Sequence, residues 1–490
     1  MTGDPLGEFK SISPYLERGV ALTVDLDGTL VKTDLLWESL WNRISHNALI
    51  LFRFIFLLMV SGKAAAKAYL AQASTVKPSR LPYNEDVLAF CRSWADAGGK
   101  VYLATASNEQ LAQAIADHLG FFDGVFASSE TLNLKGQAKA DLLQAEFAEN
   151  GYGYIGDSAA DFPVWRASKF VIAVTSSLKF RRRVIGAHQD AIIIATDKTK
   201  PASYLRALRP HQWIKNILVF IPAIAAHQFT SDALINSVLA FLALSMTASS
   251  AYIVNDLFDL SNDRAHPRKR FRPFAAGQIP LSHSVFMLPV LWLMAVIAAL
   301  QIGTAFAGIL LLYFILTISY STFIKRLLLL DVFTLAGLYT IRLIAGGLAT
   351  SIILSEWLVL FSGFFFLSLA AIKRQAELED LSGRDLAVIK GRAYRTDDTP
   401  IIANMAMVAG YASVLVMALY LNSQSVQLLY SEPAVLWGIC IILLYWISRL
   451  VIITKRGQMD DDPIVFSIRD RASYYCFAII LALALFATVL

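Results

Sequence analysis

Cysteine and charge are both scarce in this sequence. Only 3 of 490 residues are cysteines and 17% are charged, whereas 56% are hydrophobic. Cys91, Cys440 and Cys476 lie far apart, without the spacing of a metal site, so we interpret them as reduced residues of the interior. The net charge of +5 is small and gives no indication of a nucleic-acid partner. A chain this long and this apolar is expected to have at least two domains.

A signal-peptide pattern is also missing at the start of the sequence. Residues 1–10 do not show a basic segment followed by an apolar run, so we expect the first domain to stay in the cytoplasm. Residues 1–197 have the composition of a soluble α/β domain, whereas apolar runs and short polar loops alternate through 213–490. We predict a linker with an interfacial helix at 198–212, between this α/β domain and an all-α membrane bundle.

Nine apolar runs in the second part of the chain approach the roughly 20 residues that a membrane-spanning helix needs. The first run is short and contains Lys215. The predicted spans are 213–227, 234–254, 283–302, 304–322, 330–349, 356–373, 401–421, 433–453 and 474–490.

Lysine and arginine are absent from every second loop between these spans. None occurs in 228–233, 303, 350–355 or 422–432, whereas the other loops are basic. Because basic loops stay in the cytoplasm, the N-terminal domain is predicted on the cytoplasmic side and the C-terminus outside. We therefore expect an integral protein of a bacterial cytoplasmic membrane, with its active sites facing the cytoplasm.

Polar side chains follow three buried-strand patterns of the N-terminal domain, at 20–24, 100–104 and 152–155. Strands that alternate with helices and end in polar residues are typical of an open parallel sheet with a site at the strand ends. The candidate site residues are Asp25, Asp27, Thr105, Lys139, Asp157 and Asp161. Paired carboxylates can act as nucleophile and as general acid/base, while a hydroxyl and a lysine can hold phosphoryl oxygens.

These residues form four motifs, which carry in order Asp25 with Asp27, Thr105, Lys139, and Asp157 with Asp161. In this order the motifs resemble the haloacid dehalogenase (HAD) superfamily of phosphatases over residues 15–195. The resemblance implies that Asp25 is the nucleophile and Asp27 the acid/base, and that Thr105 and Lys139 bind phosphate. It also implies a Mg²⁺ site and a helical cap at 33–82, whose run at 48–60 is unusually apolar. The implied metal ligands are Asp25, Asp27, Asp157 and Asp161. Either acidic motif alone could be an ordinary turn, and a retained fold without activity stays an alternative.

An acidic group lies at the end of the second predicted span. Asp256, Asp259 and Asp263 fall on one face of a continuous helix, with Asn255 beside them. Three carboxylates on one face repel each other unless a cation such as Mg²⁺ lies among them and bridges a diphosphate. A basic string that can bind phosphate oxygens, or alternatively anchor the protein on anionic lipids, follows. It consists of Arg264, Arg268, Lys269, Arg270 and Arg272.

The pattern Asn-Asp-x-x-Asp-x-x-x-Asp-Arg at 255–264 resembles the first aspartate-rich motif of the UbiA superfamily of intramembrane prenyltransferases. The segments 209–216, 266–277 and 373–378 narrow the resemblance to the decaprenyl-phosphate phosphoribosyltransferase branch, over residues 205–490. That branch transfers 5-phosphoribose from phosphoribosyl pyrophosphate to a polyprenyl phosphate. The resemblance implies that Asp256, Asp259 and Asp263 hold Mg²⁺, and that substrate ligands include Asn255, Arg264, Lys269 and Arg272.

The second acidic motif of conventional prenyltransferases is absent after the sixth span. Lys373, Arg374 and Glu377 lie there instead, and cations in place of metal ligands suit a donor with an additional phosphate. Arg342 lies inside a span, where a charge is costly unless it is paired, so the acceptor's phosphate is a candidate partner. The other candidate substrate ligands are Lys215 and Lys325.

We therefore expect a bifunctional, Mg²⁺-dependent membrane enzyme. Its partners would be polyprenyl phosphate, phosphoribosyl pyrophosphate and the lipid bilayer, with no nucleic acid and with a homo-oligomer left open. The fused domain is expected to remove the 5-phosphate of the lipid-linked product, with the run at 48–60 holding it against the bilayer.

Two other functions stay alternatives. A conventional prenyltransferase with a prenyl diphosphate donor is disfavoured by the cations after the sixth span. A non-catalytic lipid-binding or transport protein is disfavoured because no inverted repeat is visible and the acids gather at one membrane face.

Overall fold

The computed structural model describes residues 14–47, 49–60, 69–70, 76–129, 133–196, 199–383, 392–459 and 462–489. Parts of the predicted cap and the first residue of the apolar run at 48–60 lie outside these ranges. The chain forms two compact units. The first combines 1–208 with 252–288, and the second combines 209–251 with 289–490. The domain limits expected from the sequence stay predictions.

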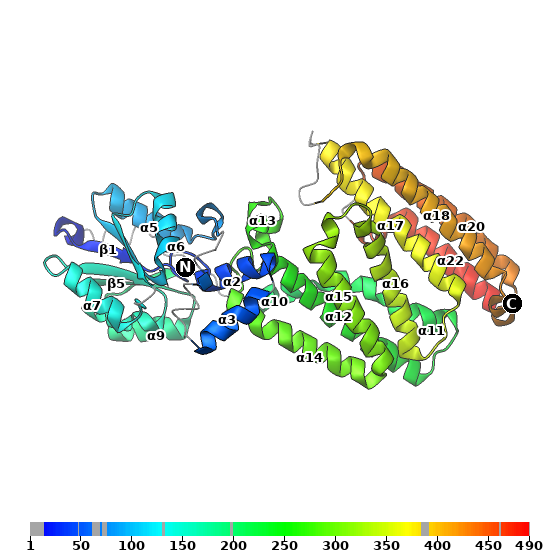
Figure 1. Cartoon of the computed structure of the whole chain (residues 1–490), viewed down its shortest axis with the longest axis horizontal. Helices are drawn as coiled ribbons and strands as arrows, with labels where there is room; N and C mark the ends of the chain where they lie inside the picture. The colour runs from blue at the N-terminus through cyan, green and yellow to red at the C-terminus, as the bar shows by residue number, and fades with distance from the viewer. Residues whose placement is uncertain are drawn as a thin grey trace. The chain divides into compact units, whose positions relative to one another are not determined.

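The first unit contains a six-stranded parallel sheet with the order β3-β2-β1-β4-β5-β6 (Figure 1). The strands are β1 (Ala21–Val24), β2 (Val101–Asn108), β3 (Gly124–Ser128), β4 (Tyr152–Gly156), β5 (Phe170–Thr175) and β6 (Ile192–Ala195). The three strands predicted from the sequence are confirmed as β1, β2 and β4, and they are neighbours. Their carboxyl ends therefore meet at one edge of the sheet.

Both faces of the sheet are covered by helices, because alternate residues of each strand point to opposite sides. Leu22, Ile155 and Ile172 pack with α5 (Glu85–Asp96) and α6 (Glu109–Leu119). Tyr154 and Val171 pack with α7 (Gln137–Glu146), α8 (Phe162–Ala167) and α9 (Leu178–Ala187). Figure 1 shows α5 and α6 on one face and α7 and α9 on the other.

The insertion after β1 is helical in its described part, as predicted for the cap. It contains α2 (Leu35–His46), α3 (Leu49–Val60) and the short 3₁₀ helix η1 (Pro78–Arg80). Asp34 begins α2 as its N-cap and accepts a hydrogen bond from the backbone N–H of Leu36. The predicted interfacial segment contains α10 (Pro201–Leu208), which belongs to the same unit.

Eight helices of the described chain are long and apolar enough to cross a membrane. They are α12 (Ser231–Phe258), α14 (Ser284–Ile302), α15 (Thr304–Thr322), α16 (Leu330–Thr350), α17 (Glu356–Ser382), α18 (Thr399–Leu421), α20 (Trp437–Lys455) and α22 (Arg471–Val489). They correspond to the second to ninth predicted spans. In an apolar 18-residue stretch of each helix, 61% of the residues of α12 and α16 are buried, whereas only 17% are buried in α14, α15 and α22. The polar side chains of α12 and α16 are therefore the best shielded from lipid.

The first predicted span, 213–227, does not form a long α-helix, and this expectation is corrected. It is a 3₁₀ helix, η3 (Pro210–Phe220), followed by the short helix α11 (Ile221–Ala225). The physical reason is that Lys215 and Asn216 are buried in polar contacts inside the bundle rather than facing lipid. Because a 3₁₀ helix rises about 2 Å per residue, against about 1.5 Å in an α-helix, η3 is longer than an α-helix of the same number of residues.

Candidate active sites

An acidic cluster lies at the carboxyl edge of the sheet in the first unit. Asp25 follows β1, and carboxylate oxygens of Asp25, Asp157 and Asp161 lie within 4.8 Å of one another. Lys139 of α7 donates to Asp25 Oδ1 at 3.1 Å, and both side chains are buried. The structure thus brings together residues from three separate segments of the sequence, around Asp25, Lys139 and Asp157.

Asp27 is held by two donors close to this cluster. Its Oδ1 accepts from the backbone N–H of Leu35 at 2.8 Å, and its Oδ2 accepts a short hydrogen bond from the Ser107 hydroxyl. Thr105, predicted to bind phosphate, is fully buried, and its hydroxyl accepts from the Ser107 N–H at 3.0 Å. Ser107 therefore connects the end of β2 with the predicted acid/base.

The electrostatics of this cluster suit a bound divalent cation. Burial raises the pKa of Asp25, where Lys139 opposes the shift, and burial together with Asp25 and Asp161 raises the pKa of Asp157 well above its usual value. Burial, with Asp34 nearby, also raises the pKa of Asp27 to about 7. A cation among these carboxylates would relieve their repulsion, and an all-oxygen donor set fits Mg²⁺.

Gly28 and Tyr154 shape the same cluster. Gly28 has a φ of +76°, and a Cβ there would lie 2.4 Å from Asp157 Oδ2, so only glycine permits this approach. The Tyr154 hydroxyl accepts from Lys139 Nζ at 2.7 Å and donates to Asp161 Oδ1 at 3.2 Å. Tyr154 therefore links the predicted phosphate ligand to the predicted metal ligand.

The aspartate-rich segment also belongs to the first unit. The helix is interrupted at Asp259, between α12 and α13 (Leu260–Ala265). The backbone N–H of Asp259 still donates to the Asn255 carbonyl, and that of Asp263 to the Asp259 carbonyl, as in an α-helix. Asp256 and Asp263 are buried and share the Arg272 guanidinium, at 3.1 and 2.6 Å.

Arg272 thus occupies the position between two carboxylates that we predicted for a cation. Burial raises the pKa of Asp263, with Arg272 opposing the shift. The buried carboxylate oxygens of Asp256 and Asp263 are suitable ligands for Mg²⁺ if Arg272 moves away from them to bind a substrate phosphate, the role predicted for Arg272 from the sequence.

Arg264, predicted as a substrate ligand, forms an ion pair with the cap instead. Its guanidinium contacts both carboxylate oxygens of Glu38 in α2, at 2.5 and 3.1 Å, and donates from Nε to the Ala275 carbonyl at 2.9 Å. The Thr33 hydroxyl donates to Glu38 at 2.9 Å. Arg80 adds bonds to the Ser261 backbone and hydroxyl. The aspartate-rich segment is therefore joined to the cap by partly buried polar contacts.

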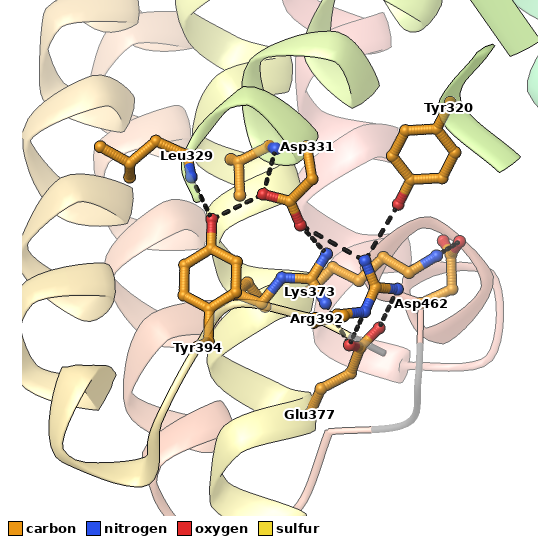
Figure 2. Close-up of polar contacts among 10 residues, drawn as sticks. Tyr320, Leu329, Asp331, Lys373, Glu377, Arg392, Tyr394 and Asp462 are labelled. Atoms are coloured by element: carbon orange, nitrogen blue, oxygen red, sulfur yellow. Dashed lines mark hydrogen bonds and ion pairs between the residues drawn. The ribbon is translucent and has the colours of Figure 1, made fainter. Parts of the chain in front are cut away.

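A second cationic cluster lies in the second unit. Lys373 of α17 lies 3.4 Å from Asp462 Oδ2 (Figure 2). Lys215 of η3 contacts the same oxygen at 2.5 Å. Burial opposes ionisation, but Lys373 and Lys215 lower the pKa of Asp462 to about 2. Two cations facing one carboxylate leave a net positive charge, which favours binding of an anion such as a phosphate.

Arg374, the neighbour of Lys373, belongs to a different and electrically balanced group. It is fully buried, contacts Asp331 at 2.5 Å and forms a short ion pair with Glu377. Arg392 lies 3.3 Å from Asp331 and 3.2 Å from Glu377 (Figure 2). The Tyr394 hydroxyl donates to Asp331 at 2.6 Å. Two cations and two anions cancel, so the predicted role of Arg374 in phosphate binding receives no support from its contacts.

Arg342 is buried in the most enclosed part of the second unit, on α16. It donates to Asn216 Oδ1 and to the Tyr313 hydroxyl, both at 2.8 Å, and to the Leu338 carbonyl. Its guanidinium also lies over the ring of Tyr339, 5.2 Å from its centroid. Within the described ranges no carboxylate pairs with it, so its charge is held by neutral acceptors and aromatic rings.

The remaining predicted ligands are placed as follows. Asn255 and Asp259 are half-buried in the aspartate-rich segment, and Lys269 is exposed in the 3₁₀ helix η4 (Lys269–Phe271). Lys325 is half-buried in the 3₁₀ helix η6 (Ile324–Arg326) of the second unit.

Two known family patterns match this chain. That of the UbiA prenyltransferase family matches residues 217–456, and that of haloacid dehalogenase-like hydrolases matches 22–166. The y4nM protein of Sinorhizobium fredii is 36% identical over 95% of this chain and 90% of its own length. The chain belongs to the UbiA prenyltransferase family. Among its relatives, the nodulation protein NoeC of Azorhizobium caulinodans is 35% identical over 58% of this chain and 91% of its own.

A further relative of this UbiA-family protein is the decaprenyl-phosphate phosphoribosyltransferase of Mycobacterium tuberculosis. It is 35% identical over 39% of this chain and 64% of its own length. The UbiA and HAD-like parts together make the protein an enzyme, an integral membrane transferase with a fused hydrolase domain. The compact first unit crosses the boundary between them, because 252–288 lies inside the UbiA match.

Several side chains of this UbiA-family protein that touch predicted ligands were not identified from the sequence. They are Glu38, Ser107, Tyr154, Asp331, Arg392, Tyr394 and Asp462. Ser107 and Tyr154 lie within the strand patterns that carry the motifs, so position could have indicated them. Asp331 is a lone acid at the start of an apolar span, where a charge is costly, and that cost is a usable signal.

Proposed function

We propose that the helical part transfers 5-phosphoribose from phosphoribosyl pyrophosphate to polyprenyl phosphate, and that the HAD-like domain removes the 5-phosphate of the product. The observation that carries the proposal is the net positive cluster of Lys215, Lys373 and Asp462. It suits a donor that carries one phosphate more than a prenyl diphosphate. The relatives named decaprenyl-phosphate phosphoribosyltransferase support the same assignment.

In the transfer step, an oxygen of the polyprenyl phosphate attacks C1 of the ribose, and the C1–O bond to pyrophosphate breaks. Mg²⁺ held by Asp256, Asp259 and Asp263 would neutralise charge on the pyrophosphate. We assign to Lys215 and Lys373 the binding of the 5-phosphate, whose charge balances their excess. Arg272 would pair with a pyrophosphate oxygen in exchange for the carboxylates that it contacts now.

The acceptor's prenyl chain requires an apolar binding surface. A cavity of about 750 Å³ lies between α16 and α17, and Ala336, Gly337, Val359 and Gly363 are among its lining residues. Small side chains leave space along both helices, and its lining suits an isoprenoid rather than a polar group.

In the phosphatase step, a carboxylate oxygen of Asp25 attacks the phosphorus of the 5-phosphate. The ester bond to O5 breaks, and Asp27 donates a proton to O5, so that the lipid-linked ribose leaves with a free hydroxyl. Lys139, 3.1 Å from Asp25, orients the nucleophile and offers positive charge to a phosphoryl oxygen. Water then hydrolyses the aspartyl phosphate. Mg²⁺ held by Asp25, Asp157 and Asp161 would lower the repulsion between nucleophile and phosphate.

The cap carries a feature that suits a lipid-linked substrate. On α3, Leu49, Phe52, Phe56 and Met59 are 70%, 71%, 62% and 81% exposed. A surface helix this apolar is costly in water and favourable at a membrane interface. We therefore assign α3 to contact with the bilayer, on the cytoplasmic side of a bacterial cytoplasmic membrane.

The test supplies membranes containing the protein with labelled phosphoribosyl pyrophosphate, polyprenyl phosphate and Mg²⁺. We expect a lipid-soluble ribose product from the wild type and none from Asp256→Ala. Asp25→Asn is expected to form the phosphorylated lipid at the normal rate and to accumulate it. Protection of the site by prenyl diphosphate but not by phosphoribosyl pyrophosphate would instead identify a conventional prenyltransferase. An unchanged product from Asp25→Asn would refute the coupling of the two steps.

A further inference from the structure

A polar cavity of about 230 Å³ opens beside the phosphatase loop of the first unit. Gly28 of that loop lines it, together with Lys32, Lys200, Ser203, Arg206 and Gln278. These residues come from three separate stretches: the loop after β1, the segment around α10, and the chain that follows the aspartate-rich segment. None of the four predicted motifs of the HAD-like domain includes Lys32, Lys200 or Arg206.

The cavity is strongly positive. Lys32, Lys200 and Arg206 carry three positive charges, and none of the described lining residues is acidic. Among the ion pairs of the described residues, none includes Lys32 or Lys200, and both residues are exposed. Arg206 donates to Gln278 Oε1 at 2.9 Å and to the Ser203 hydroxyl at 3.2 Å, both of which are neutral. The charge of the cavity is therefore available to an anion.

The walls of the cavity are fixed by close packing. Gly277 has a φ of +67°, and a Cβ there would lie 3.0 Å from Lys32 Cβ and 3.1 Å from its carbonyl oxygen. The Ala275 carbonyl accepts from Arg264, which is itself paired with Glu38. The backbone that carries Gln278 is thus held against the loop that carries Lys32.

Gly28 connects this cavity with the reacting groups. It is three residues beyond Asp25, and on its other side it lies against Asp157 of the acidic cluster. A phosphoryl group at Asp25 therefore lies among the acidic residues and Lys139, and the positive cavity lies on the other side of Gly28. A substrate with two anionic groups separated by a sugar would satisfy both.

We infer that this cavity binds a second phosphate of the phosphatase substrate, a phosphodiester on the far side of the pentose. The inference rests on the proposed function, in which the product of transfer carries a 5-phosphate and a phosphodiester at C1. The cavity selects such substrates over simple sugar phosphates. An anionic membrane lipid carries the same phosphodiester chemistry, so the experiment separates the two sources.

The experiment uses the full-length Asp25→Asn protein in detergent with Mg²⁺, so that ligands bind without being hydrolysed. Calorimetry compares ribose 5-phosphate with the methyl phosphodiester of ribose 1,5-bisphosphate. We expect the diester to bind at least tenfold more tightly. Lys200→Ala should remove roughly tenfold of that affinity, the contribution of about one charged hydrogen bond, and leave ribose 5-phosphate unchanged. Lys179→Ala, an exposed lysine on α9, is the matched control and should alter neither ligand.

Equal binding of the two ligands, no binding of the diester, or an equal effect of Lys200→Ala on both would overturn the inference. In a second arm, vesicles of phosphatidylglycerol are added. If Lys200→Ala weakens vesicle binding but not diester selectivity, the cavity serves a lipid headgroup and the inference is wrong. Accumulation of phosphorylated lipid by Asp25→Asn tests the proposed function separately, so failure of one is distinguishable from failure of the other.

Discussion

Lys373 and Arg374 are adjacent in the sequence, yet their contacts predict opposite effects on substitution. Arg374→Met would remove a guanidinium that is 0% exposed and pairs with Asp331, which is also 0% exposed. Losing one member of a buried pair costs about 3–5 kcal/mol, because the other charge is left uncompensated. Arg392, 3.3 Å from Asp331, offsets part of this, so we expect a loss of about 3 kcal/mol.

Lys373→Met should have little effect on stability and a large effect on activity. The Lys373 side chain is 25% exposed, and Asp462 keeps Lys215 at 2.5 Å as a partner. A partly exposed pair contributes at most about 1 kcal/mol. Loss of a charged contact to the substrate phosphate, worth about 1.5–3 kcal/mol, should lower transfer roughly 10- to 100-fold.

The assay measures melting temperature in detergent and ribose transfer in membranes for both variants. Arg374→Met should melt roughly 5 °C lower or more, whereas Lys373→Met should melt close to the wild type. Lys455→Met is the control. The Lys455 side chain is 66% exposed and pairs with Glu379, so its loss should change neither the melting temperature nor the transfer rate much. A stable Arg374→Met protein, or a fully active Lys373→Met protein, would refute the assignment of these two neighbours.

Three further results are expected. Asp462→Asn should lower the free energy of unfolding by about 2–3 kcal/mol near neutral pH, because the folded structure lowers the pKa of Asp462 to about 2. The wild type has this additional stability in full above a pH of about 4 and loses it as the pH falls toward 2, so the melting curves of variant and wild type should converge at low pH. Gly28→Ala should abolish phosphatase activity and leave transfer unchanged in the lipid-product assay, because its Cβ would lie 2.4 Å from an Asp157 oxygen. Saturating Mg²⁺ should raise the stability of the HAD-like domain by about 3 kcal/mol at 100 times its Kd, as measured by calorimetry, and Asp157→Asn should lose most of this gain.

The acidic cluster at the edge of the sheet could be predicted from the sequence because its residues are fixed by local patterns. Asp25 follows β1, Asp157 follows β4 and Thr105 lies in the second half of β2. The parallel order of β2, β1 and β4 brings these three residues to one edge. Lys139 is placed by the helix between two of these strands. Strand periodicity and motif order were therefore sufficient for this constellation.

The partners of the basic residues could not be predicted in the same way. Arg264 and Glu38 are 226 positions apart, and Lys215 and Asp462 are 247 apart. Pairing over such separations is decided by tertiary packing, which residue type and spacing do not encode. The form of 213–227 was missed for the same reason, since the burial of Lys215 and Asn216 depends on distant helices.

The Glu38–Arg264 pair bears on whether the two enzymes can be separated. Dividing the chain between the HAD-like domain and the helical part would place Glu38 on one fragment and Arg264 on the other, although their side chains are only 5% and 9% exposed in the pair. A charge that stayed buried in its own fragment without this partner would cost several kcal/mol. A split gene would therefore need compensating substitutions at both positions, and two-protein relatives of this enzyme should carry uncharged or differently paired residues where Glu38 and Arg264 stand here.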